Sequence, residues 1–217
     1  PKYVLEVGCG TCHWLQGLMG DEQCKLFGID KAHKMLEQAQ EPNRLLLCQG
    51  IAESLPFQPD TFDFIYCVNA IHHFSEPNVF IYQAKRLLKP EGSLAIIGMD
   101  PRDPRNNWYI YDFFEGTLET DLARFPAWNQ VSDWLNEAKF SNIHRQEIEL
   151  IHDPKTHDSV LEDPFLSKNA CSQLALLSKH DYKKGLERLR EHVKSHAETG
   201  FRYENDILIS MLVAYNT

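Results

Sequence analysis

The residues that first suggest chemistry lie near the start of the chain, in the segment VLEVGCGT at residues 4–11. A strand would deliver the acid Glu6 to the edge of a sheet, and a turn at Gly8 and Gly10 would let a ligand approach the backbone. A second acid, Asp30, follows 22 residues after Gly8, where a carboxylate can accept both hydroxyls of a ribose. This spacing indicates nucleotide binding. An ordinary strand–turn–helix connection with surface acids is the simpler alternative.

Two adjacent histidines, His72 and His73, could carry proton transfer. They follow the fourth expected strand, at the same edge of the sheet as the glycine turn. Imidazole titrates near neutral pH, so either histidine could act as a general base. The alternative is that one of them packs within the fold and the other contacts a cofactor.

The cysteines support a different chemistry. Cys9, Cys12 and His13 have the C-x-x-C-H spacing of c-type haem attachment, and Cys9 with Cys12 could also form a redox pair. Haem attachment needs an exported and exposed segment, whereas this one lies inside the expected strand–turn–helix. Six cysteines in 217 residues are too few for a disulfide scaffold and suit small buried side chains in a reducing cytoplasm.

The other histidines do not form a set that we predict to bind metal. The His-Asp pairs at 152–153 and 157–158 are metal-capable but more typical of a charged surface loop. His192 and His196 share one face of an expected helix, without a third ligand nearby in the sequence. We therefore predict no metal site.

Strands that alternate with helices would position these residues. The hydrophobic pattern predicts strands over 3–7, 25–30, 44–49, 62–69 and 93–99, helices over 12–20, 32–40 and 77–88, and a turn over 89–92. This alternation is typical of a parallel sheet with helices on both faces, in which ligands bind at the carboxyl ends of the strands. We therefore expect the loops at Gly8, Asp30, Gly50 and Asn69 to meet at one edge.

The composition fits a folded domain and disfavours several classes of partner. Hydrophobic residues are 43% and charged residues 24%, and no run approaches the roughly 18 apolar residues that span a bilayer. A net charge of −9 disfavours nucleic acids and anionic membranes. The most basic segment, 183–190, is interrupted by Glu187.

The pattern changes after Asp100. Residues 101–129 are rich in aromatic side chains, which would either form the core of a lid or line an apolar acceptor pocket. Residues 152–205 are predicted as a mostly helical insertion, whose clearest helix follows a capping-box spacing at Ser178. A helix over 130–140 and strands over 143–150 and 207–215 complete the expected elements.

Four further segments complete a specific pattern: GIAESLPF at 50–57, FDFI at 62–65, NAIHHF at 69–74 and LLKPEGSL at 87–94. With residues 4–11, they resemble the class I S-adenosylmethionine-dependent methyltransferases of the small-molecule type, with a domain like that of the ubiquinone and menaquinone biosynthesis enzymes. The resemblance is strong from Tyr3 to about Asp100 and looser over 131–143 and the last strand.

The resemblance implies an α/β fold, Rossmann-like and doubly wound. Its mostly parallel sheet would have a final antiparallel strand and a helical lid insertion. The chain, 1–217, would be a single methyltransferase domain, with the cofactor-binding core in 1–100 and lid or substrate-side insertions in 101–129 and 152–205. It would transfer a methyl group from S-adenosylmethionine to a partly apolar small-molecule acceptor in the cytoplasm, leaving S-adenosylhomocysteine.

The resemblance also implies roles for the matched residues. Glu6 would face the amino group of the methionine part of the cofactor, and the turn at Gly8, Gly10 and Thr11 would pass beneath it. Asp30 would bind the ribose hydroxyls. The other implied contacts are Lys31 beside the adenine, Ala52 and Glu53 at its edge, Asn69 and Ala70 at the methionine end, and His73 or His72 as a general base for a hydroxyl or amine acceptor.

Two departures from the family pattern stand out. Cys12 takes the place of the family's third glycine, and the family's helix before the first strand is not in this sequence, which would leave an open site. An NAD-dependent oxidoreductase would share the sheet, the glycine turn and Asp30, but would normally keep that third glycine. A non-catalytic cofactor-binding partner protein is a further alternative. An arsenic methyltransferase would use thiolates such as Cys48, Cys67 or Cys171, for which burial in the fold is the simpler explanation.

Overall fold

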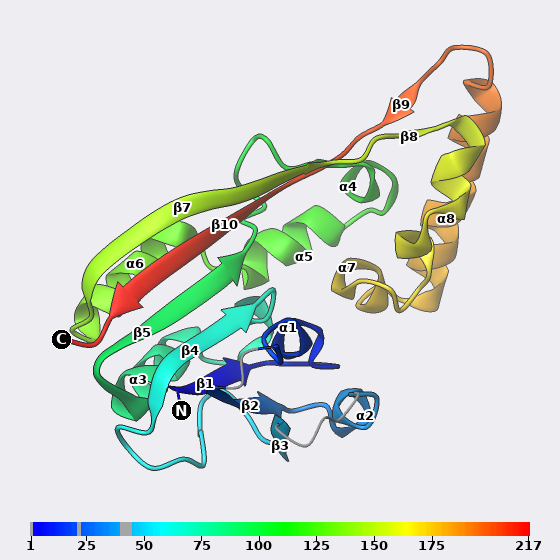
Figure 1. Cartoon of the computed structure of the whole chain (residues 1–217). Coiled ribbons are helices and arrows are strands. Elements are labelled where there is room, and N and C mark those ends of the chain that lie inside the picture. The colour runs from blue at the N-terminus through cyan, green and yellow to red at the C-terminus, as the bar shows by residue number, and fades with distance from the viewer. Residues whose placement is uncertain (1, 21–22, 40–44) are drawn as a thin grey trace. The chain divides into compact units, whose positions relative to one another are not determined.

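The computed structural model describes residues 2–20, 23–39 and 45–217 (Figure 1). This part of the chain divides into two compact units. Unit 1 comprises Pro1–Met99, Pro126–Ile148 and Ser210–Thr217, and unit 2 comprises Asp100–Phe125 and Glu149–Ile209. The end of the predicted helix at residue 40 and the start of the predicted strand at residue 44 lie outside the described residues.

Unit 1 is built on a sheet with the strand order β3-β2-β1-β4-β5-β10, and β7 pairs with β10. Its strands are β1 (Lys2–Val7), β2 (Cys24–Asp30), β3 (Leu45–Gln49), β4 (Phe62–Val68), β5 (Leu88–Gly98), β7 (Ser141–His152) and β10 (Asn205–Tyr215). The first five strands are parallel, and β10 runs antiparallel to β5 with Ser210 opposite Gly98. The predicted mostly parallel sheet with a final antiparallel strand is confirmed.

Helices cover both faces of this sheet. They are α1 (His13–Gly17), α2 (His33–Leu36), the 3₁₀ turn η1 (Ile71–His73), α3 (Pro77–Leu87) and α6 (Trp128–Glu137). Pro77 starts α3, where its missing N–H costs no hydrogen bond, and Phe80, Ala84 and Leu87 recur on one buried face. Each large side chain buried in this way contributes about 1.5–3 kcal/mol.

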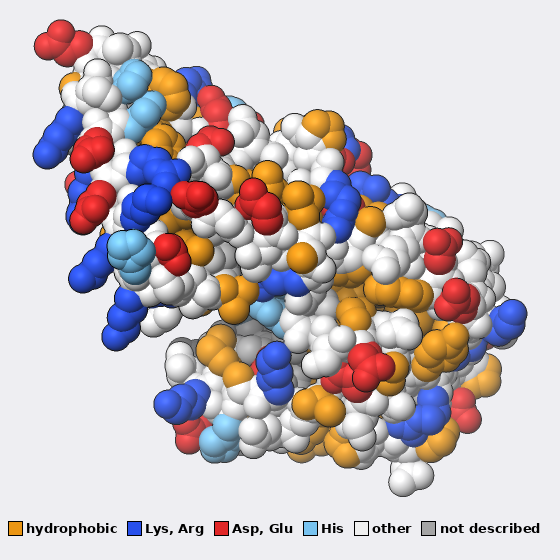
Figure 2. Space-filling model, turned by 180° about the vertical axis from the view of Figure 1, so that it is seen from behind, with side chains coloured by type: hydrophobic (Ala, Val, Ile, Leu, Met, Phe, Trp, Pro, Cys, Tyr) orange, Lys and Arg blue, Asp and Glu red, His pale blue; other side chains and the backbone are white. Residues whose placement is uncertain are grey.

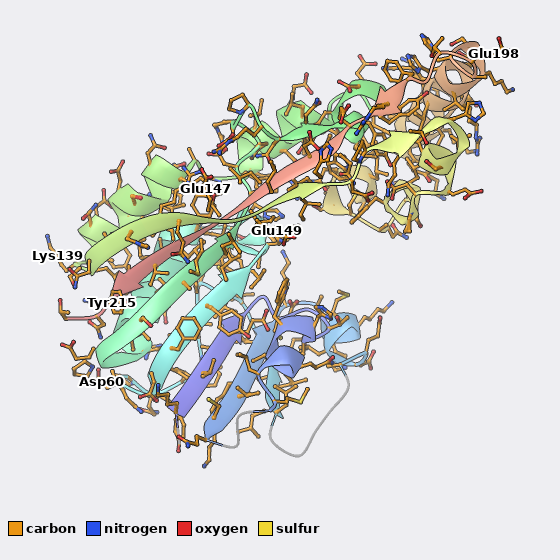
Figure 3. The ribbon with its side chains drawn as sticks, turned by 45° about the horizontal axis from the view of Figure 1, so that its top comes forward. Asp60, Lys139, Glu147, Glu149, Glu198 and Tyr215 are labelled. Atoms are coloured by element: carbon orange, nitrogen blue, oxygen red, sulfur yellow. The ribbon has the colours of Figure 1, made fainter. Side chains whose placement is uncertain are left out.

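The sheet divides its core into two clusters because successive strand residues point to opposite faces. Leu5 and Val7 pack with α3 and α6, whereas Val4 packs with Leu15 of α1 on the other side. The last two long strands meet at their ends: Lys139 lies just before β7 and Tyr215 ends β10 (Figure 3). There the hydroxyl of Ser141 donates to the carbonyl of Tyr215 at 3.3 Å.

Unit 2 has its own aromatic core. Its elements are β6 (Asn107–Trp108), α4 (Tyr109–Phe113), α5 (Thr117–Arg124), β8 (Lys155–Thr156), the 3₁₀ turns η2 (His157–Glu162) and η3 (Pro164–Leu166), α7 (Ser172–Ala175), α8 (Lys179–Ser195) and β9 (Arg202–Tyr203). Trp108, Tyr109 and Phe114 are buried against Leu189 of α8. These aromatic side chains of the segment 101–129 therefore form core within the unit. The hydroxyl of Ser178 accepts the N–H of Asp181 at 3.1 Å, as the predicted helix cap requires.

Three local predictions are wrong, and each has a physical reason. Among the described residues, the predicted helix over 32–40 forms only at His33–Leu36, where no side chain is buried. The predicted helix over 12–20 forms only at His13–Gly17, because Trp14 and Leu18 face solvent and only Leu15 is buried. The predicted turn over 89–92 belongs to β5, which begins at Leu88. Glu91 does adopt a turn-like φ of 64°, but its N–H donates to the carbonyl of Asn216 at 2.7 Å, which continues the strand. Among the described residues, no helix is long and apolar enough to cross a membrane.

Candidate active site

A cavity of about 340 Å³ opens at the carboxyl ends of four parallel strands of unit 1. Each of the four loops that follow β1, β2, β3 and β4 contributes to its wall. The lining residues are Val7, Gly8, Gly10, Ile29, Asp30, Lys31, Ala32, Met35, Gly50, Ile51, Ala52, Glu53, Asn69, Ala70, His73, Phe74 and Ser75. The predicted meeting of these loops at one edge of the sheet is confirmed.

The glycine turn is shaped by close backbone approach. Gly8 has φ 74° and Gly10 has φ 53°, in the left-handed region that L side chains rarely adopt. A Cβ on Gly8 would lie 2.6 Å from the Cβ of Ala70, so only glycine lets the loop after β1 pack against the loop after β4. The N–H groups of Gly8 and Cys9 both donate to the carbonyl of Ile29, at 2.8 and 3.1 Å, which joins the turn to β2.

Asp30 is held in place by two backbone hydrogen bonds. Its Oδ2 accepts the N–H of Gly10 and its Oδ1 accepts the N–H of Ala32, both at 2.8 Å. Each carboxylate oxygen can accept two hydrogen bonds, so each keeps capacity for a ligand hydroxyl. The carboxylate lines the cavity in a fixed orientation, as recognition of two adjacent hydroxyls requires.

Lys31 and Glu53 tie other loops around the cavity together. The Lys31 Nζ donates to the carbonyl of His73 at 3.1 Å, which links the loops after β2 and β4. The Glu53 Oε1 accepts the N–H groups of Ser75 and Glu76, at 2.6 and 3.1 Å, just before α3. A carboxylate favours the positive end of a helix, so Glu53 stabilises the start of α3 while it lines the cavity.

The loop after β4 supplies the opposite wall. Asn69 adopts φ 47°, and its N–H donates to the carbonyl of Ile97 at 2.8 Å. His73 lines the cavity, whereas His72 is not one of the lining residues. The two imidazole rings lie side by side with their centroids 4.1 Å apart.

Glu6 occupies the other face of β1. It is 1% exposed and is not among the residues that line the cavity. Its carboxyl accepts the hydroxyl of Tyr66 at 3.3 Å and the N–H of Leu15 in α1. Burial, with a smaller contribution from the charge of Cys12, raises the pKa of Glu6 to about 8. Thr11 is likewise absent from the lining.

Comparison with known proteins agrees with this geometry. Residues 5–96 match the family described as "Methyltransferase domain", which covers all four loops around the cavity. Residues 5–96 are thus a methyltransferase domain. A structure from Anabaena variabilis, described as a methyltransferase from an antibiotic biosynthesis pathway, matches with a TM-score of 0.74 at 22% identity, covering 99% of this chain and 91% of that one.

Curated relatives are similar over much of the chain. "Uncharacterized methyltransferase YcgJ" of Bacillus subtilis is 29% identical over 72% of this chain and 62% of its own length. "Ubiquinone biosynthesis O-methyltransferase" of Dechloromonas aromatica is 27% identical over 68% of this chain and 66% of its own. "tRNA U34 carboxymethyltransferase" of Shewanella denitrificans is 26% identical over 65% of this chain and 44% of its own. The chain thus spans less than two thirds of YcgJ and less than half of the tRNA enzyme.

Sequence reasoning missed several apolar residues of the methyltransferase domain's cavity. Met35 belongs to the predicted helix over 32–40, and it is 41% exposed and lines the cavity. Ile51 and Phe74 line it as well. Both follow strand ends inside segments that the resemblance had already matched, so their position in the chain was the available signal.

The cysteines are free thiols. Cys67 is fully buried in β4, and burial raises the pKa of its thiol well above the usual range, which makes it a poor thiolate. Burial likewise raises the pKa values of Cys48 and Cys171. These environments favour structural thiols over the acceptor-activating thiolates of an arsenic methyltransferase.

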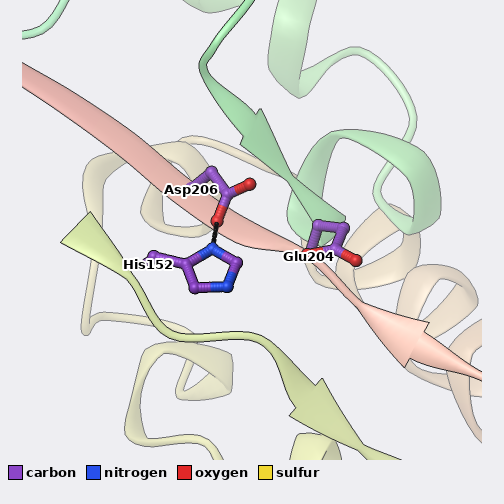
Figure 4. Close-up of side chains that lie close together, drawn as sticks. All are labelled: His152, Glu204 and Asp206. Atoms are coloured by element: carbon purple, nitrogen blue, oxygen red, sulfur yellow. Dashed lines mark hydrogen bonds and ion pairs between the residues drawn. The ribbon is translucent and has the colours of Figure 1, made fainter. Parts of the chain in front are cut away.

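Among the described residues, one group of metal-capable side chains is found in unit 2, and none of its members lines the cavity. His152, Glu204 and Asp206 bring their ligand atoms within 4.8 Å of one another (Figure 4). The Nδ1 of His152 lies 2.5 Å from the Oδ1 of Asp206, which is the distance of a hydrogen-bonded pair. Two ligands at right angles around an ion, each about 2.1 Å from it, would lie about 3 Å apart. The arrangement is that of a hydrogen-bonded histidine–carboxylate pair.

Proposed function

We propose that this protein transfers a methyl group from S-adenosylmethionine to a small-molecule acceptor, with the cofactor bound in the 340 Å³ cavity. The observation that carries the proposal is the Asp30 carboxylate, which lines the cavity while two backbone N–H groups, one of them from the glycine turn, fix its orientation. The size of the cavity falls within the roughly 300–1,000 Å³ of small-molecule sites.

In this proposal, each of the four loops contacts a part of the cofactor. Asp30 binds the ribose hydroxyls with the lone pairs that the backbone bonds leave, and Gly8 and Gly10 present bare backbone beneath the sugar. The adenine lies against Lys31, Ala52 and Glu53, with Ile51 and Met35 as apolar walls. The methionine end lies against Asn69 and Ala70. Glu6 supports the glycine turn from the opposite face of β1.

The chemical step requires no covalent catalysis by the protein. The sulfonium of the cofactor is already a good leaving group, so the protein contributes in-line positioning of the acceptor and exclusion of water. A hydroxyl or amine acceptor must also lose a proton. His73 is the proposed base because it lines the cavity, and His72, whose ring lies beside it, would position the His73 ring.

The proposed acceptor is a partly apolar small molecule, and a nucleic acid is not the proposed partner. Lys and Arg side chains are interspersed with Asp and Glu on the face shown in Figure 2. The net charge of −9 would also repel a polyanion. Six free cysteines support a location in the reducing cytoplasm. The lid function of segments 101–129 and 152–205 remains a prediction.

Calorimetry with S-adenosylmethionine, S-adenosylhomocysteine and NAD tests the cofactor. Asp30→Ala removes the carboxylate that accepts the ribose hydroxyls. It should weaken binding of both sulfur nucleotides by about 10- to 100-fold, since hydrogen bonds to charged groups contribute about 1.5–3 kcal/mol. Asp30→Asn, which keeps one oxygen acceptor for the backbone, separates ligand binding from loop geometry. Asp133→Ala removes an exposed carboxylate from α6 and should leave the affinities unchanged.

Each alternative predicts a different result. Binding of NAD alone would favour an oxidoreductase. Binding of the sulfur nucleotides without turnover of any acceptor would favour a non-catalytic partner protein. Competition by transfer RNA for a labelled acceptor would contradict the small-molecule proposal.

A further inference from the structure

Two thiols lie behind the cavity, in the turn that carries the glycines. Cys9 and Cys12 are 5% and 0% exposed, and both belong to the core cluster beneath α1. The resemblance gives them no role, since Cys12 stands where the family has a glycine. Cys12 nevertheless adopts φ 63°, the left-handed conformation that a glycine would take without strain.

The backbone already holds the two residues at the separation of a disulfide. The N–H of Cys12 donates to the carbonyl of Cys9 at 2.7 Å, which closes a four-residue turn. Such a turn places its first and last Cα atoms less than about 7 Å apart, and disulfides span about 4.4–6.8 Å.

The side chains also point toward each other. The Cys9 thiol donates a hydrogen bond to the sulfur of Cys12, which lowers the pKa of the Cys12 thiol and raises that of Cys9. Gly28 on β2 makes room for this arrangement, because a Cβ there would lie 2.8 Å from the Cys9 Sγ. Of the two thiols, Cys12 is therefore the one that ionises more readily.

We propose that Cys9 and Cys12 form a peroxide-sensitive dithiol whose oxidation to a disulfide weakens ligand binding in the adjoining cavity. The Cys12 thiolate attacks hydrogen peroxide, which gives a sulfenic acid at Cys12 and releases hydroxide. The Cys9 sulfur then displaces the sulfenic oxygen as water and forms the S–S bond. Both sulfurs are oxidised by one electron each, and peroxide is reduced to two molecules of water. Hydrogen peroxide is the oxidant named in this proposal because sulfurs that are 5% and 0% exposed exclude a bulky disulfide.

The disulfide would act on the cavity through the two residues that it encloses. Gly10 lies between the cysteines, lines the cavity and donates to Asp30 at 2.8 Å. Drawing the two sulfurs from hydrogen-bond contact to a bond of about 2.05 Å pulls the ends of this turn together and displaces the N–H of Gly10. We expect about tenfold weaker binding of S-adenosylhomocysteine, an effect that rests on the proposed function.

The test uses reduced full-length chain exposed to hydrogen peroxide. Peptide mass spectrometry should find residues 9 and 12 linked, with the loss of two hydrogens that dithiothreitol reverses. Cys9→Ser should instead accumulate a sulfenic acid at Cys12, trapped by dimedone. Cys171→Ser, which removes a half-buried thiol of unit 2, should still form the link.

Calorimetry on the same samples then measures the affinity for S-adenosylhomocysteine. A tenfold loss on oxidation, reversed by dithiothreitol and absent in Cys9→Ser, supports the proposal. Lack of the 9–12 link, or pairing of either residue with another cysteine, overturns it. A link with unchanged affinity overturns the coupling to the cavity. If reduced protein binds neither sulfur nucleotide, the proposed function fails, while the mass measurement still decides whether the dithiol forms.

Discussion

Gly8→Ala tests whether the cavity depends on close packing between the loop after β1 and the loop after β4. Gly8 combines two features that a side chain would disturb. Its φ of 74° disfavours any L residue, and a Cβ there would lie 2.6 Å from the Cβ of Ala70. Ala70 is itself 6% exposed and belongs to the main core of unit 1, so it has little room to retreat.

The magnitude follows from these two features. A left-handed conformation costs an L residue about 1–2 kcal/mol. Forcing a methyl group into a packed core costs a further ~1–3 kcal/mol. Gly8→Ala should therefore lower the free energy of unfolding by about 2–5 kcal/mol.

Two other glycines separate these contributions. Gly116 has φ 80° but open space where its Cβ would lie, so Gly116→Ala should show the conformational cost alone. Gly17 ends α1 with open space and no positive φ, so Gly17→Ala should be neutral or stabilising by up to about 1 kcal/mol. Urea unfolding followed by circular dichroism measures all three differences.

The comparison of Gly8→Ala with Gly116→Ala decides the argument. A larger loss in Gly8→Ala, with weaker binding of S-adenosylhomocysteine, is expected if the loops after β1 and β4 must touch. Equal losses in the two variants would refute the contact with Ala70 as a determinant of the cavity.

Three further substitutions probe buried groups. The pKa of Glu6 is about 8 in the folded protein, because burial disfavours its charge, against 4.5 for an exposed carboxyl. Between these two pH values the folded state therefore binds a proton that the unfolded state does not. The free energy of unfolding consequently falls as the pH rises from about 4.5 to 8. Glu6→Gln should flatten this fall by up to ~1.4 kcal/mol per pH unit, measured by urea unfolding at several pH values. Asp121→Ala should lower the free energy of unfolding by about 3–5 kcal/mol, because Asp121 is fully buried and its removal leaves Arg124, 2.7 Å away, without its carboxylate partner. A decrease of less than about 1 kcal/mol would contradict this reasoning. Gly185→Ala should lower the melting temperature despite better helix propensity, because its Cβ would clash with the buried ring of Phe114.

The sheet of unit 1 could be predicted because its information is local. Short apolar runs bounded by glycine, proline and acids mark β1, β2 and β4, and the structure places each within two residues of its predicted bounds. The site followed from the same pattern, since parallel strands bring their carboxyl ends to one edge of the sheet. Eight of the ten predicted cofactor contacts line the cavity for that reason.

What the sequence could not reveal depends on partners far along the chain. Glu91 pairs with Asn216, which lies 125 residues later in the chain. The local sequence over 89–92 therefore predicted a turn where the structure has a strand. Met35 and Leu36 are neighbours on a short helix, yet Leu36 packs on the core while Met35 lines the cavity. Helical spacing identified an apolar surface there but not which of its sides would meet a ligand.

Glu6 shows why a place in a motif does not fix what a side chain touches. Successive residues of a strand point to opposite faces, and Val7 lines the cavity, so Glu6 faces α1 instead. There its carboxyl accepts the N–H of Leu15, in the first turn of a helix whose N-cap residue, Cys12, supplies no side-chain cap. Glu6 thus takes the place of the missing cap and holds the glycine turn from behind. The acid before the glycines and the acid after β2 therefore act on the same turn from opposite sides: Glu6 through the start of α1, and Asp30 through the N–H of Gly10.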